Sequence, residues 1–270
     1  MNSQSKVLDW RKRRSWLASI PYYAGDLLSA EITQELVQER PECWSDNFSW
    51  LPYSEDILPE FVQRLTTYYS HFKGFHGCRP SSVRSYYERG LLGQNSDFLC
   101  DNFRQIFSDV PKKHLEAAIG QLFDRINSER GRSWFIGCDK YLLRYCGHYL
   151  IQGSEFVMSL AAQLHRSATG EDYRFRLRNY GTPTIFEVDI PVSLIPQEQH
   201  LAVAKMILSE WGQLISRRPL GFGDEPPCYV VRQDIPPECI RDHFHPAKIE
   251  DPHKSRLTYV NPLRTCDFCS

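Results

Sequence analysis

The sequence lacks the features that would place it in several large classes of protein. No run of about 18 apolar residues is present, so we expect no membrane-spanning helix. The segment from Met1 to Lys6 carries no apolar run, so we expect no secretory signal and a cytoplasmic protein. The glycine-rich fingerprint of dinucleotide-binding folds and the phosphate-binding P-loop are missing as well. If the protein binds a nucleotide, it must therefore use a binding site of another kind.

The chain also lacks an excess of charge of either sign. Its 32 basic and 33 acidic residues leave a formal net charge of −1. This balance excludes a global field that would attract nucleic acid or an anionic membrane, so any such contact needs a local patch. A dense basic run, Arg11 to Arg14, is a candidate for contact with nucleic acid, but a run of this length is more often a solvated surface.

A disulfide framework is not expected. The nine cysteines are an odd number and are scattered along the chain, which indicates reduced thiols in a cytoplasm. Cys266 and Cys269 have the spacing of half a zinc site, but no second pair lies at zinc-finger spacing, and His243, His245 and His253 are irregularly placed. We therefore expect no metal site and a free C-terminal tail.

Helical and strand patterns alternate irregularly along the 270 residues, which favours a mixed α+β fold over a doubly wound parallel sheet. Apolar residues recur at helical spacing in 54–68, where Ser54 is the expected N-cap, and in 97–107, 112–130 and 201–215. Alternation of period two between two prolines predicts a strand at 184–190. We expect an N-terminal helical extension (1–55), a main domain (56–245) with a helical insertion at about 93–131, and a C-terminal tail (246–270).

The most informative stretch runs from Gly74 to Arg79 and continues as a short helix that ends at Gly90. His76 stands beside Gly77, so an imidazole lies next to bare backbone in this predicted strand. A planar ligand could approach the Gly77 peptide without meeting a Cβ. A lone His-Gly pair is more often a buried strand histidine at a turn, so the elements that follow have to decide between the two interpretations.

Four segments, taken in order, resemble the ADP-ribosyltransferase fold, closest to its diphtheria-toxin and poly(ADP-ribose) polymerase branch. They are a His-Gly-x-Arg strand (His76, Gly77, Cys78, Arg79) with a helix ending Gly90-Leu91, an aromatic-Phe strand (Trp134, Phe135) with a helix ending Tyr145-Cys146, a strand at 184–190, and Cys228-Tyr229-Val230-Val231. The resemblance covers about residues 70 to 242. It implies split antiparallel β-sheets with flanking and inserted helices.

The resemblance also implies an activity. It implies an enzyme that transfers ADP-ribose from NAD to a macromolecular acceptor, a protein or a nucleic acid, and releases nicotinamide. His76 would hydrogen-bond the adenosine ribose, and Gly77 would hold the nicotinamide amide through its backbone. Tyr145 would stack on the nicotinamide ring, with Trp134 as the opposing wall. The other residues of the cofactor-binding segments would be Cys78, Arg79, Phe135 and Cys228. By analogy the chain suits a bacterial toxin, effector or phage-defence enzyme, with an inhibitory partner protein as a further expectation.

Two positions depart from the family pattern, and the first is Trp134, which stands where the polymerase branch has Tyr. The catalytic Glu expected just before Tyr-Ile-Val is Cys228 here, and a neutral thiol cannot supply the charge of a carboxylate. Three alternatives stay open. Asp224 or Glu225, on the loop before the strand, could provide the carboxylate; Glu155 could provide it from the helix after Tyr145; or the chain is a degenerate module that binds NAD or a protein partner without chemistry.

We favour Glu155 as the catalytic carboxylate, with Glu225 as the second candidate. Gly147 and Gly153 would allow the backbone to bend and return Glu155 to the pocket. The same Gly-Ser-Glu sequence also has the pattern of a helix N-terminus, with Ser154 as the cap and Glu155 interacting with the helix dipole. The sequence supports both interpretations equally.

Overall fold

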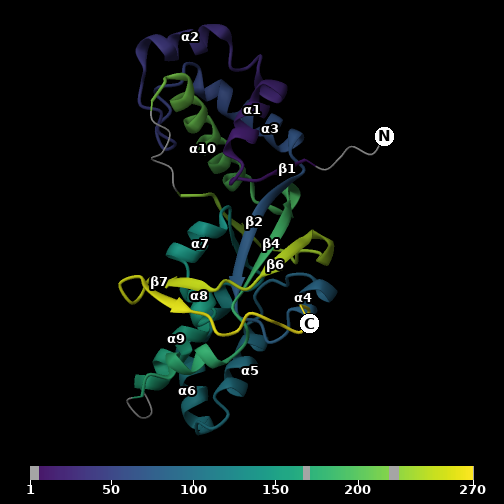
Figure 1. The fold of residues 1–270 in the computed structure, drawn as a ribbon, viewed down its shortest axis with the longest axis vertical. Helices are drawn as coiled ribbons and strands as arrows, with labels where there is room; N and C mark the ends of the chain where they lie inside the picture. The colour runs from purple at the N-terminus through teal and green to yellow at the C-terminus, as the bar shows by residue number, and fades with distance from the viewer. Residues whose placement is uncertain (1–5, 167–170, 219–224, 270) are drawn as a thin grey trace. The chain divides into compact units, whose positions relative to one another are not determined.

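The computed structural model describes residues 6–166, 171–218 and 225–269 (Figure 1). The chain divides into two compact units. Unit 1 contains Met1–Gly74, Ile136–Cys138 and Asp189–Tyr229, and unit 2 contains Phe75–Phe135, Asp139–Val188 and Val230–Ser270. Strands β2 to β5 contribute residues to both units. Over the described ranges, the helices are all too short or too polar to span a membrane.

The main sheet is built from strands that carry the sequence motifs. Its strands are β1 (Val7–Leu8), β2 (His71–Cys78), β3 (Ser133–Ile136), β4 (Thr184–Pro191), β5 (Cys228–Val231) and β6 (Ile240–Phe244). The strand order is β5-β3-β2-β4-β6, and β1 pairs with β2 in parallel. β4 and β6 are antiparallel, with Ile185 opposite Phe244. The expected mixture of helices with antiparallel strands is confirmed, and the four motif strands are consecutive in the order β5-β3-β2-β4.

Unit 1 is a group of helices around α3 (Ser54–Tyr68). The others are α1 (Arg13–Ala24), α2 (Ala30–Glu39) and α10 (Gln197–Ile215), with the 3₁₀ turn η3 at Val192–Leu194. Ile57, Phe61 and Leu65 follow one another at helical spacing and are buried, and this face of α3 packs with α1 and α10. The predicted cap is wrong by one residue, because Tyr53 occupies the N-cap position and no side chain caps the helix.

Unit 2 has a helical core of its own. It contains α5 (Ser96–Ile106), α6 (Lys112–Ser128), α9 (Glu155–Leu164) and the 3₁₀ helix η2 (Tyr173–Asn179), which pack on one another. Phe103, Phe107 and Leu160 are fully buried among them. The two helices predicted for the insertion are confirmed. They are stabilised by α9 and η2, which lie later in the chain, so the inserted helices share a core with their neighbours in unit 2.

The C-terminal residues do not form the free tail that the sequence predicts. β7 (Lys248–Asp251) and β8 (Leu257–Val260) pair antiparallel, with Lys248 opposite Val260, and α7 and α8 pack against β7. The remaining elements of unit 2 are short. They are α4 (Arg84–Arg89), α7 (Asp139–Tyr145), α8 (His148–Ile151) and the 3₁₀ turn η4 (Pro237–Cys239).

Gly90 ends α4 with a φ of 82°, as its predicted role as a helix stop requires. The chain then forms a bridge in which Leu91 and Ile235 exchange two backbone hydrogen bonds of 2.9 and 3.0 Å. A Cβ on Gly90 would lie 2.1 Å from the Ile235 carbonyl oxygen. Only glycine therefore satisfies both the backbone conformation and the close approach.

We expect Gly90→Ala to lower the free energy of unfolding by more than about 1 kcal/mol, because the left-handed backbone and the contact with Ile235 both resist a Cβ. Gly120→Ala is the matched control. Gly120 lies in α6, where a Cβ would meet nothing within 4 Å, so alanine should raise stability by up to about 1 kcal/mol. Urea unfolding of the two variants measures both effects, and equal stabilities would contradict the assignment.

Candidate functional site

His76 lies in β2, and the peptide of Trp134 determines which ring nitrogen carries its proton. Nδ1 of His76 lies 2.9 Å from the Trp134 carbonyl oxygen. A carbonyl oxygen only accepts, so Nδ1 carries the proton and Nε2 keeps a lone pair. The ring is half-buried, and burial lowers the pKa of His76 from its ordinary value of 6.5, so the imidazole is neutral at pH 7. His76 therefore presents a hydrogen-bond acceptor.

The neighbours of His76 in the motif have mainly structural contacts. A Cβ on Gly77 would lie 2.9 Å from Cδ2 of Leu142, so the absence of a side chain there makes room for α7. Because Leu142 occupies this space, its packing is enough to explain why residue 77 is glycine, and no ligand is needed for that explanation. The thiol of Cys78 donates to the Tyr86 hydroxyl at 3.8 Å, and burial raises the pKa of Cys78 to about 12. Cys78 is therefore a neutral thiol.

Arg79, predicted among the cofactor-binding residues, is buried with 8% of its surface exposed. Its guanidinium donates four hydrogen bonds to backbone carbonyl oxygens, those of Leu150 (2.9 Å), Arg178 (2.6 Å), Tyr180 (2.9 Å) and Gly181 (2.9 Å). These bonds occupy the donors that a phosphate would need. The side chain therefore holds the segment that leads into β4.

The predicted aromatic residues differ in how they are placed. Phe135 is a core residue with 1% of its surface exposed, whereas Trp134, beside it in β3, is 50% exposed. Tyr145 ends α7, and its ring lies 4.5 Å from that of Tyr141. The Arg256 guanidinium lies 5.0 Å from the Tyr145 ring centroid, as a cation–π contact. Trp134 and Tyr145 thus keep surface for a ligand, and their role as opposing walls stays a prediction.

Glu155 begins α9, as the helix N-terminus interpretation predicts. Ser154 is the N-cap and accepts a hydrogen bond from the Val157 amide at 3.4 Å. The Glu155 side chain is about half exposed, accepts a hydrogen bond of 3.1 Å from the Tyr149 hydroxyl, and lies 3.6 Å from Nε2 of His148. The local geometry of Ser154 and Glu155 is accounted for by capping, and a catalytic role for Glu155 stays a prediction.

The second candidate carboxylate lies in unit 1. Glu225 and Cys228 line a cavity of about 340 Å³, together with Trp10, Trp44 and Glu210. Glu225 and Cys228 are exposed, whereas Glu210 is buried and forms an ion pair with Arg13. Asp224, the alternative to Glu225, lies outside the described residues. The cavity therefore offers an exposed carboxylate and a thiol in a wall that also contains two indole rings.

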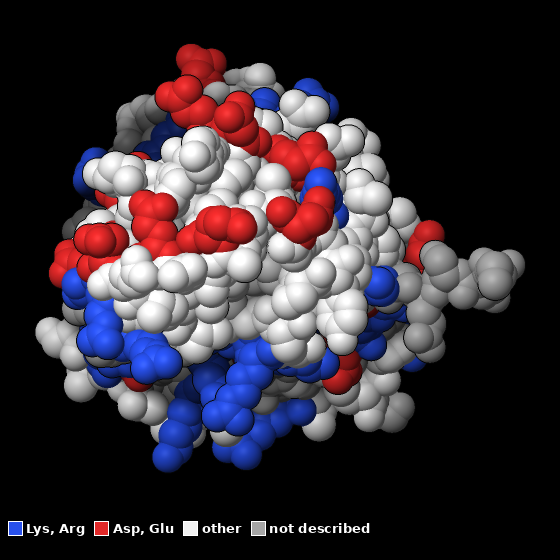
Figure 2. Space-filling view, turned by 90° about the horizontal axis from the view of Figure 1, so that it is seen from above, with Lys and Arg blue, Asp and Glu red and all other residues white. Residues whose placement is uncertain are grey.

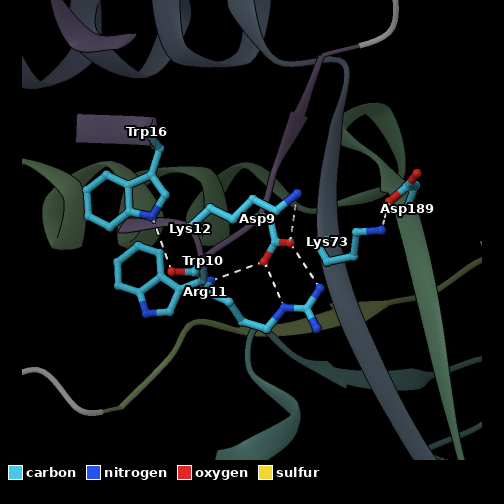
Figure 3. Close-up of polar contacts among 7 residues, drawn as sticks. All are labelled: Asp9, Trp10, Arg11, Lys12, Trp16, Lys73 and Asp189. Atoms are coloured by element: carbon cyan, nitrogen blue, oxygen red, sulfur yellow. Dashed lines mark hydrogen bonds and ion pairs between the residues drawn. The ribbon is translucent and has the colours of Figure 1, made fainter. Parts of the chain in front are cut away.

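The basic run near the N-terminus is largely used in ion pairs of unit 1 (Figure 3). The Arg11 guanidinium forms two hydrogen bonds of 3.0 Å with the buried carboxylate of Asp9, and Lys12 lies 3.9 Å from the same group. These pairs, with that of Arg13, reduce the charge available to nucleic acid. Figure 2 shows most of the acidic side chains in the upper half of the face in view and most of the basic ones in the lower half, with some in contact.

A second buried pair lies near this group. Nζ of Lys73 in β2 lies 2.6 Å from Oδ1 of Asp189 in β4, and both residues are more than 90% buried (Figure 3). A buried charge without its partner is costly, so each of these side chains requires the other.

Four residues that the sequence analysis did not expect to form a site lie together in unit 2. His243 on β6, His245 just after it, Cys266 and Cys269 each offer one nitrogen or sulfur atom, and these atoms lie within 4.8 Å of one another. The expectation that the histidines are too irregular to complete a site with the cysteines overlooked one signal. Residues i and i+2 of a strand share a face, and His-x-His at 243 and 245 has that spacing.

His76 should make stability depend on pH. The unfolded chain takes up a proton near the ordinary pKa of 6.5, whereas the folded chain takes it up only at lower pH. The unfolded state therefore binds more protons below pH 6.5, and the contribution of His76 to stability falls as the pH falls. His76→Asn keeps a donor for the Trp134 carbonyl but cannot titrate. Urea unfolding between about pH 7.5 and 5.5 should show a smaller pH dependence in this variant, and an unchanged dependence would refute the burial argument.

Lys73→Met should lower the free energy of unfolding by about 3–5 kcal/mol, because it leaves the Asp189 carboxylate buried without its ion pair. The double variant Lys73→Met/Asp189→Leu should recover most of this loss, since it removes both charges. Arg104→Met is the control, because its pair with Glu116 is partly exposed and should be worth less than about 1 kcal/mol. Equal losses in Lys73→Met and Arg104→Met would show that burial does not control the strength of the pair.

Comparisons with known proteins found no counterpart of this chain. No protein-family model matches it, no curated protein matches it, and no solved structure matches it. The resemblance to ADP-ribosyltransferases therefore stays a prediction that depends on the motifs around His76, Trp134 and Tyr145.

Proposed function

We propose that this protein binds NAD beside β2 and transfers its ADP-ribose to a macromolecule. The single observation that carries the proposal is the state of His76. The ring is neutral, partly accessible, and held by the Trp134 carbonyl so that Nε2 is an acceptor. A ribose hydroxyl is a donor that such a nitrogen would bind. The consecutive order of β5, β3, β2 and β4 in the sheet adds support, because the resemblance assigns its motifs to these four strands.

Each step of the proposed reaction requires a particular kind of side chain. His76 binds and orients the adenosine ribose, and the exposed ring of Trp134 and the partly buried ring of Tyr145 hold the nicotinamide by stacking. The bond between nicotinamide and its ribose then breaks, the bonding electron pair leaves with the nicotinamide, and the ribose becomes an oxocarbenium-like cation. A carboxylate beside that cation lowers the barrier, and the acceptor nucleophile then bonds to the same carbon.

Glu155 is the carboxylate that we propose for this role. Its side chain is about half exposed, accepts a hydrogen bond from Tyr149 and lies 3.6 Å from Nε2 of His148. A hydrogen bond to a charged group is worth about 1.5–3 kcal/mol, so ligand binding would have to supply about this much for the side chain to reorient. Glu225, at the cavity of unit 1, is the second candidate.

A second candidate function is favoured by Cys228. This exposed thiol stands at the start of β5, where the resemblance expects the catalytic Glu, and Ser154 and Glu155 already serve as a helix N-terminus. The protein would then bind NAD or ADP-ribose and act on a partner through the bound state alone.

The proposal is tested by incubating the full chain with NAD and measuring free nicotinamide. We expect release in the wild type and a loss of kcat/KM of at least about 100-fold in His76→Ala. His114→Ala, a histidine change on α6, is the control and should keep full activity. If NAD binds in calorimetry but no nicotinamide forms, the binding-module alternative holds; if NAD does not bind at all, both functions are rejected.

The same assay decides between the carboxylates. Glu155→Gln should reduce kcat by about 10²–10³-fold, because the cation loses its counter-charge but the side chain keeps its shape. Glu35→Gln, on an exposed face of α2, is the matched control. Full activity in Glu155→Gln combined with loss in Glu225→Gln would transfer the role to Glu225. NAD labelled in its adenylate part, followed by protease or nuclease digestion, would identify the acceptor class.

A further inference from the structure

We propose that His243, His245, Cys266 and Cys269 bind one zinc ion in a closed structural site. The site would hold the C-terminal segment, defined here as residues 261–269, against β6 and α4. It is independent of the NAD chemistry proposed above.

The distances between the four ligand atoms are those of a small tetrahedron. Nε2 of His243 lies 3.0 Å from Sγ of Cys269 and 3.5 Å from Sγ of Cys266. The two sulfur atoms are 3.5 Å apart, and Nε2 of His245 lies 3.7 Å from Sγ of Cys269. A zinc ion with Zn–S bonds of about 2.3 Å and Zn–N bonds of about 2.0–2.1 Å separates its ligand atoms by roughly 3.3–3.8 Å. Three of these four separations lie in that range, and the fourth, 3.0 Å, would lengthen by a few tenths of an ångström. The four side chains are therefore close to the geometry of a zinc site and need only a small adjustment to hold the ion.

The second nitrogen of each histidine is used in the way a metal ligand requires. Nδ1 of His245 lies 3.0 Å from the Pro183 carbonyl oxygen, which only accepts, so this nitrogen carries the proton and Nε2 has its lone pair directed at the cysteines. Nδ1 of His243 lies 2.9 Å from the Tyr87 hydroxyl, whose oxygen can accept a hydrogen bond from it. Such outer partners fix the ring orientation and tautomer of zinc-bound histidines.

The residues between the two cysteines hold the segment in position. The Asp267 carboxylate accepts hydrogen bonds of 2.5 Å from the Ser82 hydroxyl and 2.7 Å from the Val83 amide, at the start of α4. The Phe268 ring stacks on Tyr87 at 4.1 Å with an interplanar angle of 7°. Because Asp267 and Phe268 already order the segment, little further chain entropy is lost when a metal binds.

The donor set also indicates the metal and its role. Two thiolates and two imidazoles in a tetrahedron are the ligands of structural zinc, and four protein ligands leave no open position for a substrate. A disulfide between Cys266 and Cys269 is the competing state. Its bond length would be about 2.05 Å, well below the 3.5 Å separation of the sulfur atoms. It would also remove the two thiolates that would bind the ion together with the histidine nitrogens.

Metal content of the full chain, purified under reducing conditions without chelator, is the first test. We expect one zinc per chain by elemental analysis. Replacing zinc with cobalt(II) should give the strong visible absorption of a tetrahedral thiolate site together with sulfur-to-metal charge transfer. A chain that carries less than a tenth of an equivalent of zinc and gives no cobalt spectrum would overturn the proposal. A metal-free protein whose mass is two daltons below that of the reduced chain, as a disulfide requires, would overturn it too.

Four variants separate the site from a merely structural contact. Cys266→Ser and Cys269→Ser should each remove the charge-transfer band, whereas Cys138→Ser, at a cysteine outside the cluster, should leave it unchanged. Tyr87→Phe keeps the ring that stacks on Phe268 but removes the hydroxyl at His243, and should weaken zinc binding by about 10–100-fold. If Cys138→Ser weakens the band as much as Cys266→Ser does, the assignment of ligands is wrong.

Chelator provides a readout that does not depend on any variant. Anything that binds only the folded state stabilises it, so removal of zinc should lower the melting temperature of the wild type. The same chelator should leave the melting temperature of Cys266→Ser/Cys269→Ser unchanged. An equal effect of chelator on both proteins would overturn the proposal.

Discussion

The buried guanidinium of Arg79 is the interaction on which the arrangement of unit 2 depends. A charge removed from water is costly unless its donors are satisfied, and Arg79 satisfies them with the backbone carbonyls of Leu150, Arg178, Tyr180 and Gly181. These carbonyls belong to α8, to the last turn of η2 and to the chain between η2 and β4. One side chain therefore joins the end of β2 to two segments that are far away in the sequence. Without it the Leu150 carbonyl, whose bond is buried, would lack its donor at a cost of about 1–3 kcal/mol, and the three part-buried carbonyls would cost less.

Where the sequence predicted the fold well, the signal was local and repeated. Ile57, Phe61 and Leu65 mark the buried face of α3 by their spacing alone, and the proline-bounded alternation in β4 marks a strand in the same way. Gly90 was predicted as a helix stop because few residues other than glycine adopt a left-handed backbone. The residues within each of these elements are therefore enough to predict it.

The predictions that failed or stayed open depend on distant partners. The spacing of Cys266 and Cys269 is visible in the sequence, but their approach to His243 requires β6, the β7–β8 pair and a return to α4. The role of Arg79 was equally hard to predict, because the carbonyl groups that it binds lie far from it in the sequence. Glu155 is different, since the residue that caps its helix is its neighbour in the sequence. The sequence therefore predicted both a helix N-terminus and a catalytic carboxylate here, but it could not decide between them.

These distant contacts have a common effect on the strand that carries His76. β2 leads directly through Cys78 and Arg79 to α4, so whatever fixes α4 also restricts the end of β2. Arg79 fixes the chain on one side of this connection, and Asp267 and Phe268 hold α4 on the other. A binding nitrogen is effective only when its position varies by a fraction of an ångström, and side chains held by packed neighbours meet that condition better than those on free loops. The proposed zinc ion would restrict α4 further from the C-terminal side, as a structural ion with no open coordination position.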